Sequence, residues 1–314
     1  GFRVGNQVSD AFVNPDTYLT PKPENVKAKG FEYDYDSLEY ELVWSDEFDG
    51  GYSNPDATTG LNMDVWNFET GTGNGGWGTG QRDYSTTDRE NVEVSDGTLK
   101  IRTQRHHANQ PTHEYTSGRI NTQNKRAFLY GRMEAKIRTV NMTESGRGFA
   151  FWMMPNGIPA GKATLMWPQG GEIDIFEYNG LYPAYNLSST HYAWNWANNE
   201  WAGDGNHGHK GAVYDYRTRT TKYPAVEGTA QEGQWCNDGR ATHGTEKTFL
   251  LGQEWRIYGI DWYEDRIEFF VADADGSNHD VFHSFYYKNI PGGAYCGEEY
   301  TNAIGRKAIR TGND

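Results

Sequence analysis

The chain alternates between apolar and polar residues in many short runs, a pattern typical of half-buried β-strands. Clear examples are Leu99–Thr103, Met133–Arg138 and Arg256–Trp262. Turn-forming pairs such as Asp96-Gly97 and Asn156-Gly157 separate these runs. No long stretch has the periodicity of an amphipathic helix. Because strands follow one another without intervening helices, the sequence predicts an all-β sandwich or jelly roll.

Two segments depart from this pattern. Residues 1–40 are polar and contain three prolines, and we expect an N-terminal extension packed on or near one sandwich domain that spans residues 41–314. Residues 193–248 are rich in Asn, Gly, His and Trp, and we expect long loops near a binding cleft. This segment contains His207, His209 and His243, which could suggest a metal site. Histidines in polar loops are more often solvated than metal-bound, so the sequence does not establish whether a metal binds.

Composition excludes several classes of partner. The 314 residues include 29 basic and 43 acidic residues, for a net charge of −14, which argues against nucleic acid or an anionic membrane. No apolar run reaches the roughly 20 residues that a membrane-spanning helix needs. The 11 Trp and 21 Tyr suit stacking against sugar rings, and are also typical of a sandwich with short strands and tight turns.

The two cysteines and the first residue bear on the compartment. Cys236 and Cys296 would form one disulfide in an oxidising compartment, or remain free thiols. The chain begins at Gly1 without a charged and apolar leader, and we expect a mature chain whose signal peptide has been removed. We therefore expect a secreted protein, extracellular or periplasmic.

The run from Glu172 to Glu177 holds three carboxylates in an otherwise apolar stretch. Strand alternation places Glu172 and Asp174 on one face and the two intervening isoleucines on the other. Strict alternation would turn Glu177 toward the isoleucines and into the core. A β-bulge near Phe176 would return Glu177 to the acidic face, and bulges are over-represented beside active sites.

With such a bulge, the spacing of the two glutamates suits glycoside hydrolysis. They would behave as residues four apart, with Cα atoms roughly 13 Å apart, and their side chains can lean toward each other on a curved strand. A retaining glycosidase needs its two carboxyl groups about 5–5.5 Å apart, one to attack and one to move a proton. Asp174 between them would help to keep one neighbour protonated. The alternative is a metal-binding or solvated acidic edge strand, which the isoleucines disfavour because they demand burial.

The run WPQGGEIDIFEY, from Trp167 to Tyr178, resembles the E-I-D-x-x-E active-site signature of family 16 glycoside hydrolases, and most of all their laminarinase (endo-β-1,3-glucanase) branch. Further landmarks cover roughly residues 41 to 271: VWSDEF at 43–48, GTGNGGWG at 71–78, YTSGRI at 115–120, YGRMEA at 130–135, and the stretch 258–271. The resemblance implies a concanavalin-like β-jelly-roll sandwich with the substrate in a cleft across the concave sheet.

The resemblance also implies roles for individual residues. Glu172 is the expected nucleophile, Glu177 the general acid/base, and Asp174 the residue that orients and electrostatically tunes the nucleophile. The residues expected to contact sugar are Trp77, Arg119, Trp152, Trp167 and His191.

The chain departs from the family pattern at several points. Gly148-Phe149-Ala150 and Thr79–Asp83 differ from common motifs that line the outer sugar subsites. The two strands that normally end the family domain, after the equivalent of Val271, are not predicted, and residues 284–314 have no matching pattern. The family's structural calcium usually takes a ligand from the last of those strands, so calcium binding is left open. No cofactor is required for catalysis.

We therefore expect a monomeric, retaining endo-glycoside hydrolase that cleaves β-1,3-glucan of the laminarin type. The same mechanism on mixed-linkage β-glucan, or on a red-algal galactan such as agar or porphyran, is an alternative. The net charge would repel a densely sulfated polymer unless arginines such as Arg119 and Arg147 offset it. A non-catalytic β-glucan-binding protein is a third reading, although such proteins typically lose the catalytic glutamates that this chain has.

Overall fold

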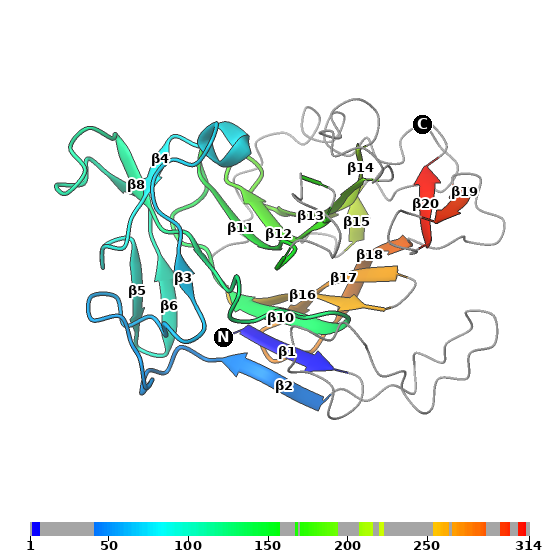
Figure 1. Ribbon diagram of the computed structural model, residues 1–314, viewed down its shortest axis with the longest axis horizontal. Helices are drawn as coiled ribbons and strands as arrows, with labels where there is room; N and C mark the ends of the chain where they lie inside the picture. Colours follow the sequence, from blue (N-terminus) through cyan, green and yellow to red (C-terminus); the bar gives the residue numbers. More distant parts are fainter. Residues whose placement is uncertain are drawn as a thin grey trace. The chain divides into compact units, whose positions relative to one another are not determined.

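The computed structural model consists almost entirely of β-strands (Figure 1). It describes residues 2–6, 41–157, 167–168, 170–193, 207–215, 220–222, 254–263, 266–286, 296–301 and 307–311. Within these ranges the regular elements are strands, apart from the helical turn Gly76–Gly80 (η2). No helix in the described ranges is long and apolar enough to cross a membrane. The prediction of an all-β protein is confirmed.

The described residues fall into two compact units, one built mainly from Trp44–Leu129 and the other from Tyr130 onward. The second unit holds the five-stranded antiparallel sheet β11-β12-β13-β14-β15. Its strands are β11 (Gly148–Met153), β12 (Glu172–Asn179), β13 (Tyr185–Ala193), β14 (His207–Asp215) and β15 (Thr220–Lys222).

A six-stranded sheet has the order β18-β17-β16-β10-β1-β2. Its strands are β1 (Phe2–Asn6), β2 (Glu41–Asp46), β10 (Gly131–Ile137), β16 (Arg256–Trp262), β17 (Arg266–Asp273) and β18 (Asp280–Tyr286). Buried Phe176 of β12 stacks on buried Tyr258 of β16, with ring centroids 4.0 Å apart. The two sheets therefore pack face to face where β12 meets β16, both in the second unit, as in a β-sandwich.

Gly259 shows how closely this sandwich is packed. A Cβ atom at that position would lie 2.8 Å from the carbonyl oxygen of Met133 on the neighbouring strand, and 2.4 Å from the Phe270 ring. Only glycine fits here, so the alternating run around residue 259 forms a strand whose middle lacks a side chain.

The first unit consists of short strands around its own apolar core. These are β3 (Asn67–Phe68), β4 (Asp83–Ser85), β5 (Val92–Ser95), β6 (Thr98–Ile101), β7 (Gln104–Arg105), β8 (Tyr115–Ser117) and β9 (Ile120–Asn121). Buried Asp46 accepts hydrogen bonds from the Trp66 indole at 2.8 Å, the Tyr52 hydroxyl at 2.5 Å and the Phe48 amide at 3.1 Å. The VWSDEF landmark thus has a structural role, because its aspartate ties the core together.

Among the described residues three strands begin after Val271, where the sequence pattern predicts none. Besides β18, the strands β19 (Cys296–Thr301) and β20 (Lys307–Thr311) pair with each other. Strand β18 escapes pattern reading because a bulge interrupts its pairing, and consecutive Phe282 and His283 are both buried. Two buried neighbours break the period of two on which the prediction depends.

The expectation of loops throughout residues 193–248 was also wrong, because β14 and β15 lie there. His207 and His209 belong to β14, whereas His243 and Cys236 lie outside the described residues. In the N-terminal segment, residues 2–6 form β1 and residues 7–40 lie outside the described residues. The division into an extension and a single domain therefore stays a prediction.

Candidate active site

A β-bulge in β12 is the feature that organises the site. On β13 the partners of Asp174 and Glu177 are Ser189 and Leu187, which lie two positions apart, whereas the two acids lie three apart. On β11 the pairing skips Ile175, which is the extra residue. The predicted bulge is therefore confirmed, and it lies next to Phe176 as expected.

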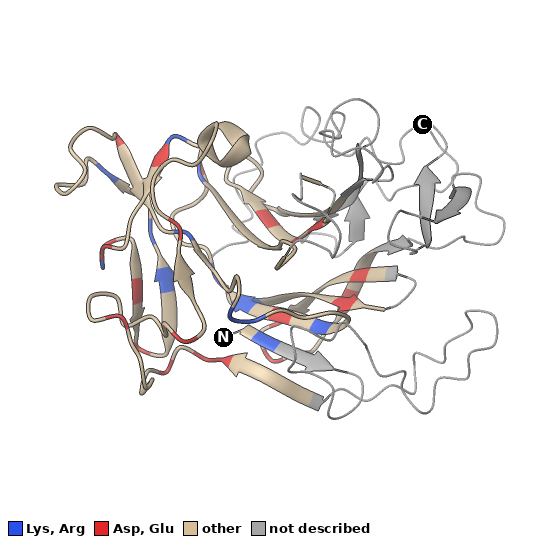
Figure 2. Ribbon diagram, viewed as in Figure 1, with Lys and Arg blue, Asp and Glu red and all other residues tan. Residues whose placement is uncertain are grey.

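The bulge places all three carboxylates on one face of the sheet. The partners of Glu172, Asp174 and Glu177 are spaced two residues apart on β13. Directly opposite residues of an antiparallel pair share a face, so the three acids share one as well. We call this the acidic face of β12; Figure 2 shows the acidic residues of the strand in red.

The other face of β12 is packed into the core. Ile173, Ile175, Phe176 and Tyr178 are all less than 10% exposed. This burial fixes the register, because a slip by one residue would exchange the apolar and acidic faces. The core therefore holds the carboxylates in place.

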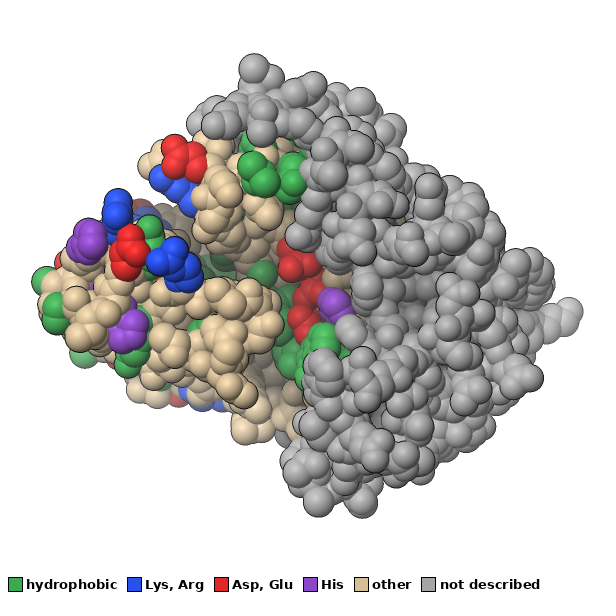
Figure 3. Space-filling model, turned by 90° about the horizontal axis from the view of Figure 1, so that it is seen from above, with side chains coloured by type: hydrophobic (Ala, Val, Ile, Leu, Met, Phe, Trp, Pro, Cys, Tyr) green, Lys and Arg blue, Asp and Glu red, His purple; other side chains and the backbone are tan. Residues whose placement is uncertain are grey.

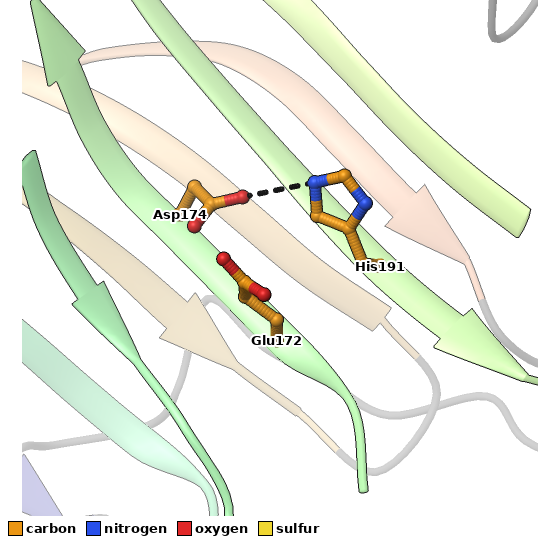
Figure 4. A group of neighbouring side chains, drawn as sticks. All are labelled: Glu172, Asp174 and His191. Atoms are coloured by element: carbon orange, nitrogen blue, oxygen red, sulfur yellow. Dashed lines mark ion pairs between the residues drawn. The ribbon is translucent and has the colours of Figure 1, made fainter. Parts of the chain in front are cut away.

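Asp174 lies at the centre of the acidic face and is 3% exposed. Ser189 Oγ donates a hydrogen bond to Asp174 Oδ2 at 2.7 Å, and His191 Nε2 lies 3.3 Å from the same oxygen (Figure 4). A buried carboxylate needs such partners. Both come from β13, where Ser189 pairs with Asp174 and His191 pairs with Glu172. Asp174 is therefore held rigidly between the two glutamates.

Glu172 is half-buried next to Asp174, and the Trp167 indole N–H donates a hydrogen bond to its Oε2. Burial and, secondly, the negative charge of Asp174 raise the pKa of Glu172 to about 7, although the Trp167 hydrogen bond opposes this rise. A pair of close carboxyl groups that retains one proton near neutrality is a feature of carboxylate catalysis.

His191 completes the polar group. Burial lowers its pKa, but the hydrogen bond and charge of Asp174, followed by the charges of Glu172 and Glu177, outweigh burial, so the pKa is raised. Its ring lies 5.4 Å from the Trp167 ring, between centroids. Figure 3 shows acidic side chains next to a histidine on the visible surface.

Ligand atoms of Glu172, Asp174 and His191 lie within 4.8 Å of one another, the one such group of three found among the described residues. Carboxylate oxygens and an imidazole nitrogen are atom types that bind metal ions in proteins. However, Ser189 and His191 already contact Asp174 Oδ2, and the Trp167 N–H occupies Glu172 Oε2. These contacts favour a hydrogen-bonded carboxylate pair. The open question of a structural calcium ion stays open.

The predicted sugar-binding residues form two groups. In the second unit, Trp167 and His191 contact the acids, and Trp152 pairs with Asp174 in the register of β11, which places it on the acidic face. In the first unit, the guanidinium carbon of Arg119 lies 4.3 Å from the Trp77 ring centroid. The structure thus brings the predicted residues together within each unit.

Sequence reasoning missed Ser189 and Glu69. Ser189 lies two positions before His191, and counting back along the alternating strand would have placed it on the same face. Glu69 binds Arg119, with 2.6 Å between Oε2 and Nε, across fifty positions of sequence. No local pattern reveals a pair so far apart.

The sequence model "Glycosyl hydrolases family 16" matches residues 80–249, which is more than half of the chain. This chain belongs to glycoside hydrolase family 16. A "Beta-glucanase" of Rhodothermus marinus is 36% identical over 239 residues, which cover 75% of this chain and 64% of that protein. The "Glucan endo-1,3-beta-glucosidase A1" of Niallia circulans is 30% identical over 258 residues, covering 79% of this chain but 29% of its own length.

Solved structures agree with this family membership. The laminarinase from Rhodothermus marinus superposes with a TM-score of 0.52 and 25% identity, covering 78% of this chain and 74% of that one. The predicted jelly-roll sandwich is therefore confirmed. This family 16 chain spans 64% or less of the length of the two relatives named above.

Proposed function

We propose that this family 16 protein is a retaining endo-glycoside hydrolase that cleaves β-1,3-glucan of the laminarin type. The β-bulge of β12 carries the proposal, because it places Glu172, Asp174 and Glu177 on one face. Strict alternation would turn Glu177 to the other face, and a bulge that returns it beside Glu172 has a use when these two carboxylates must act on one bond.

The environments of the three acids support a division of roles. Glu172, held by the Trp167 N–H, attacks the anomeric carbon once it is ionised, and forms a glycosyl-enzyme intermediate. Glu177, four strand positions along on the same face, protonates the departing oxygen and then activates water. Asp174, fixed by Ser189 and His191, orients Glu172 and, after burial, contributes to its raised pKa. None of these steps needs a metal or a cofactor.

The substrate follows from charge and from the relatives. Those named above are a β-glucanase and a glucan endo-1,3-β-glucosidase, and a neutral glucan suits a chain with a net charge of −14. The proposal includes a secreted, monomeric enzyme. The non-catalytic alternative is disfavoured because both glutamates are present on the acidic face.

A digest panel tests the choice of polymer. On laminarin, lichenan, agarose and porphyran, we expect kcat/KM to be highest on laminarin, by about tenfold or more over the others. Reducing-end release from each polymer is the measurement, with the Glu172→Gln variant as the blank. Preference for a galactan would discard the laminarinase assignment, and absence of hydrolysis on all four would favour a binding protein.

A further inference from the structure

Glu69 and Arg119 are held together by both backbone and side chains. Glu69 directly follows β3 and Arg119 directly precedes β9, and Phe68 pairs with Ile120 in the ladder between these strands. The Glu69 amide donates to the Arg119 carbonyl at 2.9 Å. The 2.6 Å ion pair between their side chains is therefore built on a fixed backbone, which reduces the entropy lost in forming it.

This pair is also partly removed from water. The exposed fraction of the side chain is 32% for Glu69 and 21% for Arg119. Solvent screens such a pair less than it screens an ion pair on the open surface. The pair therefore places a negative charge directly against the Arg119 guanidinium.

Arg119 in turn packs on Trp77. Its guanidinium lies 4.3 Å from the indole centroid, well within the range of a cation–π contact. Gly73 approaches the same indole so closely that a Cβ there would lie 2.4 Å from the ring. Trp77 has a φ of 58°, a conformation that bulky residues rarely adopt without support from their surroundings. A chain of contacts thus runs from Glu69 through Arg119 to Trp77.

The same pairing limits what Arg119 can attract. Arg119 in the first unit, like Arg147 in the second, is an arginine that would offset the chain's negative charge toward a sulfated polymer. Arg119 is paired with Glu69, and Arg147 lies 2.8 Å from Glu144. Sulfate binding by arginine depends on a guanidinium that can turn its charge and hydrogen bonds to the anion.

We propose that Glu69 is a specificity-determining residue: it positions Trp77 through Arg119 for a neutral glucan, and it withholds the Arg119 charge from sulfate esters. The inference rests on the proposed function, in which Trp77 and Arg119 contact the polysaccharide. Glu69 is a positioning residue in this account, and it takes no part in bond cleavage.

The test replaces Glu69 in two ways. Glu69→Gln keeps the shape but removes the charge, so KM on laminarin should rise about threefold to tenfold with kcat nearly unchanged. By calorimetry, its affinity for a sulfated galactan oligosaccharide at low salt should rise about fivefold, and the gain should vanish at high salt or with the desulfated oligosaccharide. Glu69→Asp keeps the charge on a shorter side chain, so it should raise KM without any gain in sulfated-galactan affinity.

The control is Asp49→Asn, which makes the same change in net charge at an exposed residue of the first unit that has no ion pair in the described part of the chain. It should alter neither KM nor sulfated-galactan affinity. A loss of kcat at constant KM in Glu69→Gln, or equal sulfated-galactan affinity in that variant and the wild type, would overturn the inference. Calorimetric binding needs no turnover, so a wild type that fails to cleave laminarin would sink the proposed function separately.

Discussion

Glu172→Gln is expected to lower kcat on laminarin by at least about a thousandfold, because an amide cannot form the glycosyl-enzyme intermediate. The amide keeps the shape of the side chain and can still accept the Trp167 hydrogen bond. The variant should therefore fold like the wild type, as judged by circular dichroism. Initial rates of reducing-end release give kcat. A matched control is Glu114→Gln in the first unit. Glu114 forms ion pairs with the exposed Arg82 and Arg105, and the kcat of this variant should stay within about twofold of wild type.

Glu177→Ala distinguishes the acid from the nucleophile. This variant should be partly rescued by substrates with good leaving groups, because such groups depart without a proton donor. Azide should also rescue it in part, because azide attacks the glycosyl-enzyme without the general base that water needs. Glu172→Ala should not regain the retaining reaction under the same conditions. Rescue in the opposite pattern would show that the roles of the two glutamates have been exchanged.

The second large effect is a pH dependence in which rate and stability change in opposite directions. The pKa of Glu172 is raised to about 7, chiefly by burial and then by Asp174, and the nucleophile must be ionised. The acid limb of kcat/KM should therefore have its midpoint near pH 7, with a fall of about fiftyfold between pH 7 and pH 5 if this group alone controls it.

Stability follows the opposite sign. A carboxyl group whose pKa is higher in the folded state than in the unfolded state stabilises the fold below its ordinary pKa of 4.5, and this contribution is lost as pH rises through about 7. Glu172→Gln removes the titrating group. Relative to wild type, the variant should gain on the order of 2 kcal/mol in free energy of unfolding between pH 4.5 and pH 8, allowing for the exposed part of the side chain.

Urea denaturation of both proteins at pH 4.5 and pH 8 measures this difference. Glu114→Gln again serves as the control, with the opposite sign. A hydrogen bond from Tyr115 and then the neighbouring Arg105 and Arg82 lower the pKa of Glu114, so its ionised form stabilises the fold and its removal should bring no gain at pH 8. An acid limb well below pH 6, together with no relative gain in Glu172→Gln, would contradict the proposed environment of Glu172.

The acidic face of β12 was predictable because its sequence carries a contradiction. Alternation satisfies Glu172, Asp174 and the isoleucines but sends Glu177 into the core, and a buried, unpaired carboxylate is too costly to accept. A bulge is the smallest change that resolves the conflict, and the structure has it at Ile175. The burial of Ile173 and Ile175 was predictable from the alternation alone.

Other features depend on residues that are distant in sequence. The pairing of Glu69 with Arg119 needs β3 and β9 side by side, and the approach of Phe176 to Tyr258 needs two sheets. Strand β18 was missed because its bulge breaks the alternation without leaving a buried charge to signal the break. Local patterns therefore reveal a bulge only where it moves a residue whose burial would be costly.

The stereochemistry of hydrolysis tests the central claim most directly. If Glu172 and Glu177 act from one face of β12 as nucleophile and acid/base, cleavage proceeds through two inversions and keeps the configuration at the anomeric carbon. Proton NMR of laminarin digestion by the wild type, recorded before mutarotation, should show the β-anomer of the new reducing end first. Initial appearance of the α-anomer would contradict double displacement and the roles given to both glutamates.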